Sequence, residues 1–172
     1  MNLSSPPVWQ QYVQDFSLSK QYKLIFVPYG SWGLITNLED SKKSLAIMYN
    51  HLDTGGKFIL EIETVSSVPE PCGIWRRGVH SRLDGSKIAV NTLASFDIRT
   101  QIFKSLCRYE LIIDSVITEV ENEDFQMYLY RFDERDALLQ EVGFKIINKY
   151  QDYTLTPATN KETPIIIYEC SR

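Results

Sequence analysis

The stretch from Tyr22 to Glu63 constrains the fold more than any other part of this 172-residue chain. It opens with a near-continuous apolar run, Lys23 to Pro28, of the kind found in parallel strands that helices cover on both faces. Apolar residues then recur with the spacing of an amphipathic helix, at Leu45, Met48, Tyr49 and Leu52. A second apolar run, Lys57 to Glu63, follows. The order strand, helix, strand predicts an α/β fold with a central parallel sheet.

The helix in this stretch has start and stop signals. Thr36 and Glu39 have the spacing of a capping box, and Asn37 is a competing N-cap. Gly55 and Gly56 stand where a left-handed C-cap would end the helix, directly before the next strand. We therefore expect the helix to extend to the Gly-Gly pair.

Residues 65–71 form a loop with two prolines, after which the chain takes on antiparallel β character up to about Arg131. Turn signals separate these strands at Asp84-Gly85, at residues 97–100 and at Asp114-Ser115. The pattern predicts a single domain over residues 1–172 with an antiparallel β subdomain inserted at residues 74–131. That sheet could close over a ligand.

The two ends of the chain are also expected to join the α/β part. Val8 to Phe16 is interpreted as a short strand followed by a loop. Asp133 is a candidate cap for a last helix that Gly143 ends. Residues 144–150 and 164–170 then predict a terminal pair of strands that resembles a hairpin.

Composition narrows the classes of function. A net charge of -4 with scattered Lys and Arg gives no basic stripe, so nucleic acid is not an expected partner. No apolar run approaches the roughly 20 residues that span a membrane, and no leader pattern is present. Three widely separated cysteines, Cys72, Cys107 and Cys170, suggest neither disulfides nor a zinc site. We expect a cytoplasmic protein without a metal.

The ordered set of Asp15-Phe16, strand, helix, Gly55-Gly56 and strand resembles the class I S-adenosylmethionine-dependent methyltransferases. The resemblance implies an incomplete Rossmann-like sheet that supplies counterparts of the family's third to seventh strands. The glycine-rich loop that opens such a domain, and the acidic residue after its second strand, are absent from all 172 residues. The chain is therefore expected to begin in the middle of the fold. The β region resembles the extension that small-molecule methyltransferases carry after their fifth strand.

The resemblance implies a cofactor site. Asp15 and Phe16 occupy the place of the pair that brackets the adenine, with the alternative that Asp15 only starts a turn and Phe16 packs in the core. Pro28, Tyr29, Gly30 and Ser31 leave the carboxyl end of a strand, where open α/β sheets place their ligand crevice. An ordinary turn before a helix is the alternative there. Lys23 departs from the family, which often has Asp at that position.

A substrate site is expected around Trp32, Glu61 and Glu63, with Trp75 and Arg76 above it at the start of the β region. The two glutamates share one face of a strand and could orient an amine or a hydroxyl. Trp32 could instead fill the core, and Trp75 and Arg76 could belong to a solvated hairpin. Methyl transfer mainly requires proximity, so no catalytic residue is assigned.

The expected function is that of an S-adenosylmethionine-dependent methyltransferase, a transferase for a small-molecule acceptor, with weak or partner-dependent cofactor binding. Without the first strands, the apolar edge of the Tyr22 to Pro28 strand is expected to pair in a homodimer or with a partner chain. Val8 to Val13 could also pair there. Two alternatives stay open: a non-catalytic regulatory or ligand-binding remnant of the methyltransferase fold, and an unrelated ligand-binding module built on the β region.

Overall fold

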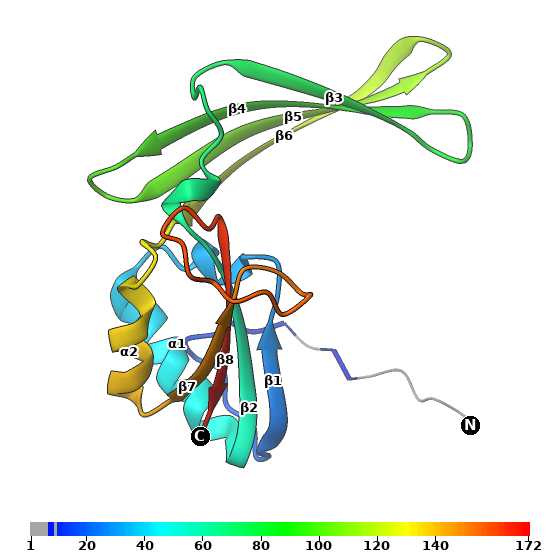
Figure 1. The fold of residues 1–172 in the computed structure, drawn as a ribbon. Helices are drawn as coiled ribbons and strands as arrows, with labels where there is room; N and C mark the ends of the chain where they lie inside the picture. Colours follow the sequence, from blue (N-terminus) through cyan, green and yellow to red (C-terminus); the bar gives the residue numbers. More distant parts are fainter. Residues whose placement is uncertain (1–6, 9) are drawn as a thin grey trace.

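The protein is described by a computed structural model, which places residues 7, 8 and 10–172. It has a mixed α/β fold with two four-stranded sheets (Figure 1). The first sheet has the order β1-β2-β8-β7, with β1 (Tyr22–Val27) parallel to β2 (Leu52–Glu63). The other two strands, β8 (Ile165–Ser171) and β7 (Lys145–Tyr150), are antiparallel to their neighbours. The expected parallel pair and terminal hairpin are confirmed.

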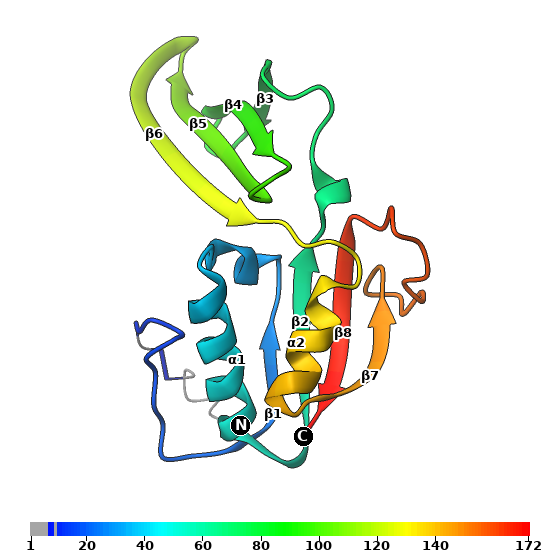
Figure 2. The same cartoon turned by 90° about the vertical axis from the view of Figure 1, so that its left-hand side faces the viewer.

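Two helices cover one face of the first sheet, as Figure 2 shows: α1 (Leu38–His51) and α2 (Glu134–Val142). Alternation along the strands directs the core residues toward these helices. The fully buried members of this core include Leu45 of α1, Leu139 of α2, and Phe58, Leu60 and Ile62 of β2. On the opposite face Leu24 and Phe26 of β1 are exposed. One side of the sheet is therefore a closed core and the other is open.

The end of α1 differs from the expectation. Asn37 is the N-cap, and its Oδ1 accepts hydrogen bonds from the backbone N–H groups of Glu39 and Asp40. The helix ends at His51, and β2 begins at Leu52. Gly55, with φ +72°, thus lies inside the strand, where the register with β1 shifts. The glycine pair permits an irregularity in the strand rather than a helix cap.

The expected strand at Val8 to Phe16 is wrong over the described part of that segment; Trp9 lies outside the described residues. The Asp15 N–H donates to the Tyr12 carbonyl at 3.0 Å and closes a turn. A strand needs a neighbour for its backbone groups, and this segment lies beside α1 instead of the edge of β1 (Figure 2). The first sheet consequently holds no counterpart of the family's third strand among the described residues.

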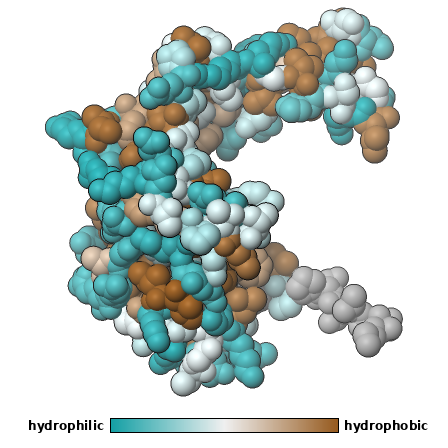
Figure 3. Space-filling view, in the orientation of Figure 1, coloured by the Kyte–Doolittle hydropathy of each residue, from teal (hydrophilic) through white to brown (hydrophobic). Residues whose placement is uncertain are grey.

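The second sheet is an antiparallel meander of four strands, in the order β3 (Trp75–Ser81), β4 (Lys87–Asp97), β5 (Ile102–Ile113) and β6 (Val116–Tyr128). It projects beyond the carboxyl ends of β1 and β2, and Figure 3 shows an open recess between the two parts. Asp114 and Ser115, both with positive φ, form the expected two-residue turn. The turn at Asp84-Gly85 is longer than the expected two residues, because β3 ends at Ser81 and β4 begins at Lys87.

A short 3-10 helix follows each of the two parallel strands: η1 (Ser31–Leu34) after β1 and η2 (Val65–Ser67) after β2.

At the other end of the chain, Asp133 occupies the N-cap position of α2 as expected but makes no capping hydrogen bond with its side chain. It accepts instead from Lys149 Nζ at 3.0 Å. Gly143 ends α2 in the left-handed conformation, as predicted.

Within the described residues, no helix is both long and apolar enough to cross a membrane.

An ion-pair cluster in the second sheet gives a pH prediction. Arg108 Nε donates to Glu110 Oε1 at 2.9 Å, and Arg77 Nη1 forms an ion pair with Glu110 Oε2 at 2.8 Å. The two guanidinium groups hold the pKa of that carboxyl below its usual range. A lowered pKa in the folded state contributes stability above the unfolded value of about 4.3 and loses it as the pH falls through the folded value. We expect the free energy of unfolding in urea to fall from about pH 5 downward. Glu110→Gln should make this decline shallower, whereas Glu119→Gln, at an exposed position on β6, should leave it unchanged.

Candidate functional site

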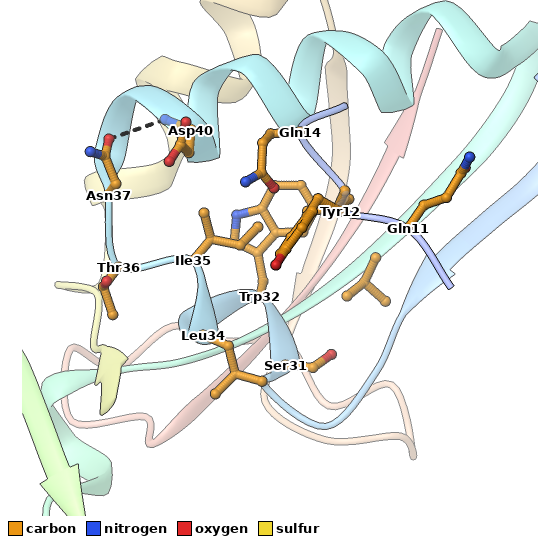
Figure 4. A pocket seen from close by; sticks show the side chains of 12 residues that line it. Gln11, Tyr12, Gln14, Ser31, Trp32, Leu34, Ile35, Thr36, Asn37 and Asp40 are labelled. Atoms are coloured by element: carbon orange, nitrogen blue, oxygen red, sulfur yellow. Dashed lines mark hydrogen bonds between the residues drawn. The ribbon is translucent and has the colours of Figure 1, made fainter. Parts of the chain in front are cut away.

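A cavity of about 580 Å³ opens beside the carboxyl end of β1 (Figure 4). Three segments enclose it: the N-terminal segment before β1, η1 with the residues that follow it, and the first turn of α1. Its lining residues are Gln11, Tyr12, Val13, Gln14, Val27, Ser31, Trp32, Leu34, Ile35, Thr36, Asn37 and Asp40. Aromatic and aliphatic surfaces dominate, with amide side chains at the margin. Such a lining suits a flat ring that also offers hydrogen-bonding edges.

Trp32 forms the inner wall of this cavity and is only 1% exposed. Its indole N–H donates to Ser41 Oγ of α1 at 2.8 Å. The same Ser41 oxygen accepts from Arg135 Nη2 of α2 at 3.0 Å. Trp32 also packs edge-on against Phe58, with ring centroids 6.3 Å apart. The indole therefore both fills the core and faces the cavity, and its assignment to the substrate stays a prediction.

The N-terminal wall is anchored to α1 through the residues next to it. The Asp15 carboxylate accepts from Lys43 Nζ at 2.6 Å. Phe16 stacks on His51, with ring centroids 4.6 Å apart, and the Leu18 N–H donates to His51 Nε2 at 3.0 Å. Asp15 and Phe16 are thus not part of the cavity lining, which is formed by the residues that precede them. Their assignment as adenine ligands stays a prediction.

The loop from Pro28 to Ser31 joins β1 to η1. Ser31 Oγ donates to the Pro28 carbonyl at 2.7 Å, and Ser31 reaches the cavity. Tyr29 and Gly30 both have positive φ, +58° and +59°. Left-handed backbone is strained for a tyrosine, and residues held in this way are concentrated at ligand sites. Tyr29 is also highly exposed.

Gly30 lies directly against Glu63, which brings two expected site residues together. A Cβ atom at Gly30 would lie 2.9 Å from both Cγ and Oε1 of Glu63. Gly30→Ala should therefore lower the free energy of unfolding by about 1–3 kcal/mol, because it adds strain at a positive φ and displaces Glu63. Urea unfolding measures this change. Gly85→Ala, with a similar φ and open space around it, is the matched control for backbone strain alone. An equal loss in both variants would contradict the contact with Glu63.

A second cavity, of about 420 Å³, lies at the open face of the first sheet and is lined by Phe26, Val27, Pro28, Tyr29, Ile59, Glu61 and Tyr153. Glu61 is 5% exposed, and the Tyr153 hydroxyl donates to its Oε2. That hydrogen bond, with burial as a smaller cause, raises the pKa of Tyr153 to about 12. The alternation of β2 places Glu61 and Glu63 on the same face, as expected.

Trp75 and Arg76 lie at the start of β3 in the second sheet. Trp75 is half exposed, and Arg76 Nη2 donates to the Pro71 carbonyl at 2.7 Å. Neither lines the two cavities described above, so their assignment to the substrate stays a prediction. Among the described residues, no group of three or more His, Cys, Asp or Glu side chains is arranged to hold a metal ion.

Several cavity residues were not expected from the sequence. Tyr12 and Gln14 were assigned to a strand, although they stand directly before the Asp15-Phe16 pair and could have been considered with it. Tyr153 comes from the connection between β7 and β8, more than 90 positions from Glu61 in the chain. No local pattern indicates a contact of that kind.

No protein-family model and no curated protein sequence matches the chain. Solved structures do resemble it. An S-adenosylmethionine-dependent methyltransferase from Clostridium acetobutylicum ATCC 824 superposes with a TM-score of 0.82 at 18% identity, over 97% of this chain and 65% of that one. The sugar N-methyltransferase KedS8 from Streptoalloteichus sp ATCC 53650 gives 0.73 at 14% identity, over 96% and 63%.

A third structure, the amino pentose methyltransferase CalS10 from Micromonospora echinaspora with S-adenosylmethionine bound, gives a TM-score of 0.68 at 14% identity, over 92% of this chain and 62% of that one. The chain thus spans less than two thirds of the length of these three structures. It has a class I methyltransferase-like fold.

Proposed function

We propose that this chain is an S-adenosylmethionine-dependent methyltransferase-like protein that acts on a small-molecule acceptor. The observation that carries the proposal is the first cavity, whose inner wall is Trp32. It stands at the carboxyl end of a parallel strand, in a fold shared with methyltransferases over nearly the whole chain. A fold alone does not assign a function, so the fit of the cavity to the cofactor matters.

The lining fits the adenosine part of S-adenosylmethionine. Tyr12, Trp32 and Ile35 offer apolar surfaces for a purine ring, and the amides of Gln14 and Asn37 offer hydrogen bonds to its edges. When bound, the cofactor would supply an electrophilic methyl group. The residues of this chain would hold its ring, exclude water from it and orient the acceptor. Asp40 is the one carboxylate among the lining residues of the described cavity.

These 172 residues contain no glycine-rich loop after a strand, and backbone N–H groups of such a loop are major polar ligands of nucleotide cofactors. We therefore propose that these residues alone bind the cofactor weakly. Binding would strengthen when another polypeptide segment contributes ligands.

The edge of β1 gives that segment a place to bind. Among the described residues β1 pairs only with β2, and Phe26 beside that free edge is 64% exposed. Unpaired N–H and C=O groups on an apolar edge are a template for another strand. We propose that a second copy or a partner chain pairs there. Light scattering that shows only a monomer at all concentrations would count against the homodimer.

A non-catalytic role on the same fold is the second candidate for these 172 residues, which by themselves contain no glycine-rich loop. Both candidates bind a ligand in the cavity at Trp32, but only the methyltransferase would transfer a methyl group to an acceptor. Both also differ from a ligand module built on the second sheet alone, in which ligand contacts would be confined to residues 74–131.

Nuclear magnetic resonance on labelled protein tests the cofactor site. S-adenosylhomocysteine, the demethylated product, should shift the indole N–H signal of Trp32 and the backbone signals of Tyr12 and Gln14. Tyr12→Ala should abolish most of this response, while Tyr109→Ala on β5 removes a tyrosine from the second sheet and should leave it intact. Shifts limited to β3–β6 would contradict the proposed site and favour the ligand module.

A further inference from the structure

The carboxylate of Glu61 differs electrostatically from the other well-buried glutamate in the structure. Glu110 is buried to the same degree and lies within 3 Å of two guanidinium groups. The half-buried Glu169 pairs with Lys57 at 2.7 Å. Among the described residues, no Lys, Arg or His nitrogen forms an ion pair with Glu61, which accepts a hydrogen bond from the Tyr153 hydroxyl.

A buried carboxylate is unfavourable unless a cation or several donors compensate it. Two carboxylate oxygens offer about four lone-pair sites. One tyrosine hydroxyl occupies a single site and supplies no charge. The other acceptor sites of the carboxylate face the second cavity and not the closed core, because Glu61 lies on the face of β2 opposite Leu60 and Ile62.

The rest of that cavity is apolar. Phe26 and Tyr29 contribute aromatic side chains, and Ile59 and Pro28 contribute aliphatic ones. Aromatic faces attract cations, and an apolar wall favours the hydrocarbon part of a ligand. One carboxylate among such walls is complementary to a compact molecule with a single ammonium group. A phosphate or carboxylate ligand would be repelled.

We propose that this cavity is a binding site for a protonated amine, with Glu61 as its counter-ion and Tyr153 holding the carboxylate in place. The inference rests on the proposed function in one respect: the amine would belong to the methyl acceptor. Both cavities include Val27, at the end of β1, in their lining.

Two probes of nearly the same shape test the charge preference. Benzylamine is protonated at pH 7, and benzyl alcohol is neutral. Titrations followed by nuclear magnetic resonance should show benzylamine binding at least ten times more tightly than benzyl alcohol, a difference of about 1.4 kcal/mol. The signals of Tyr29, Ile59 and Tyr153 should shift. Equal affinity of the two probes, or no binding of either at about 10 mM, would overturn the proposal.

Variants identify the carboxylate responsible. Glu61→Gln keeps the shape and removes the charge, and it should bring the two affinities within twofold of each other. Glu162→Gln makes the same charge change at an exposed position of the β7–β8 connection and should keep the full preference. Phe26→Ala, at an exposed wall residue, should weaken the binding of both probes, and benzylamine should still bind more tightly than benzyl alcohol, which provides a test that does not depend on the folding of Glu61→Gln. A preference that persists in Glu61→Gln would overturn the assignment.

S-adenosylhomocysteine titrated into the same samples separates the two proposals. Benzylamine preference without binding of S-adenosylhomocysteine would leave the amine site in place and contradict the cofactor site. Binding of S-adenosylhomocysteine without a preference for benzylamine would support the cofactor site and contradict the amine site.

Discussion

Trp32→Ala is expected to lower the free energy of unfolding by about 3–5 kcal/mol, as measured in urea. The indole is fully buried and packs on Phe58, and its N–H is satisfied by Ser41. Truncation removes this packing, leaves a large void, and deprives Ser41 of a donor. A loss of this size is a large fraction of the stability of a typical domain, which is about 5–15 kcal/mol. The variant should therefore unfold at a clearly lower urea concentration than the natural protein.

Trp32→Phe separates packing from hydrogen bonding. It keeps an aromatic ring and removes the indole N–H, so its cost should be nearer to 1–3 kcal/mol, about that of an unsatisfied buried group. The cavity would stay formed in this variant, which can then be compared with the natural chain for ligand binding. A Trp32→Ala variant that unfolds like the natural protein would show that the indole does not hold η1 against α1.

Arg135 is expected to respond differently to truncation and to apolar replacement. Its guanidinium is buried, stacks over Tyr130 with 4.1 Å from Cζ to the ring centroid, and contacts Ser41. Arg135 Nε and the Tyr130 hydroxyl are buried without a hydrogen-bond partner among the described residues. Burial lowers the pKa of Arg135 and raises that of Tyr130. The site therefore combines good packing with an incompletely compensated charge.

Arg135→Ala should lower the free energy of unfolding by about 2–5 kcal/mol, because it leaves a cavity between the two helices. Arg135→Met keeps most of the volume and removes the desolvated charge, so its free energy of unfolding should stay within about 1 kcal/mol of the natural value or exceed it. Urea unfolding of the two variants side by side gives the comparison. If the Met variant loses as much as the Ala variant, the charge itself is stabilising and the account of this site is wrong.

Much of the α/β part could be predicted from the sequence, because its signals are local. The spacing from Leu45 to Leu52 reflects burial on one side of a single helix, as predicted. The apolar run at Tyr22 to Pro28 predicted the strand correctly, but the expected cover on both faces is wrong, because β1 lies at the sheet edge with Leu24 and Phe26 exposed. Asp114-Ser115 and Gly143 encode their turn and cap through backbone conformations that few residues adopt.

The errors arose where tertiary structure decides between local alternatives. Gly55 suits a helix cap and a strand irregularity equally well, and the pairing of β2 with β1 selects the second. The segment before β1 has the composition of a strand, yet it leaves the edge of β1 unpaired. Instead it turns at Tyr12 to Asp15 and packs against α1.

The site was only partly predictable for the same reason. Glu61, Glu63 and Trp32 could be placed from strand direction and order along the chain. Arg135 has the local context of a solvated helix residue, and its burial depends on η1, α1 and the end of β6 meeting around it. The contact of Tyr153 with Glu61 depends in the same way on how the β7–β8 connection folds back over the sheet.

Isothermal titration with S-adenosylhomocysteine, with molar mass measured by light scattering on the same sample, tests the central claim most directly. The account predicts saturable binding with a Kd of about 1 mM or tighter, equivalent to at least about 4 kcal/mol, and a marked loss in Tyr12→Ala. Affinity that rises with the fraction of dimer would support completion of the site across the β1 edge. No binding at millimolar ligand, in the monomer and in any oligomer that forms, would contradict a cofactor site in these residues.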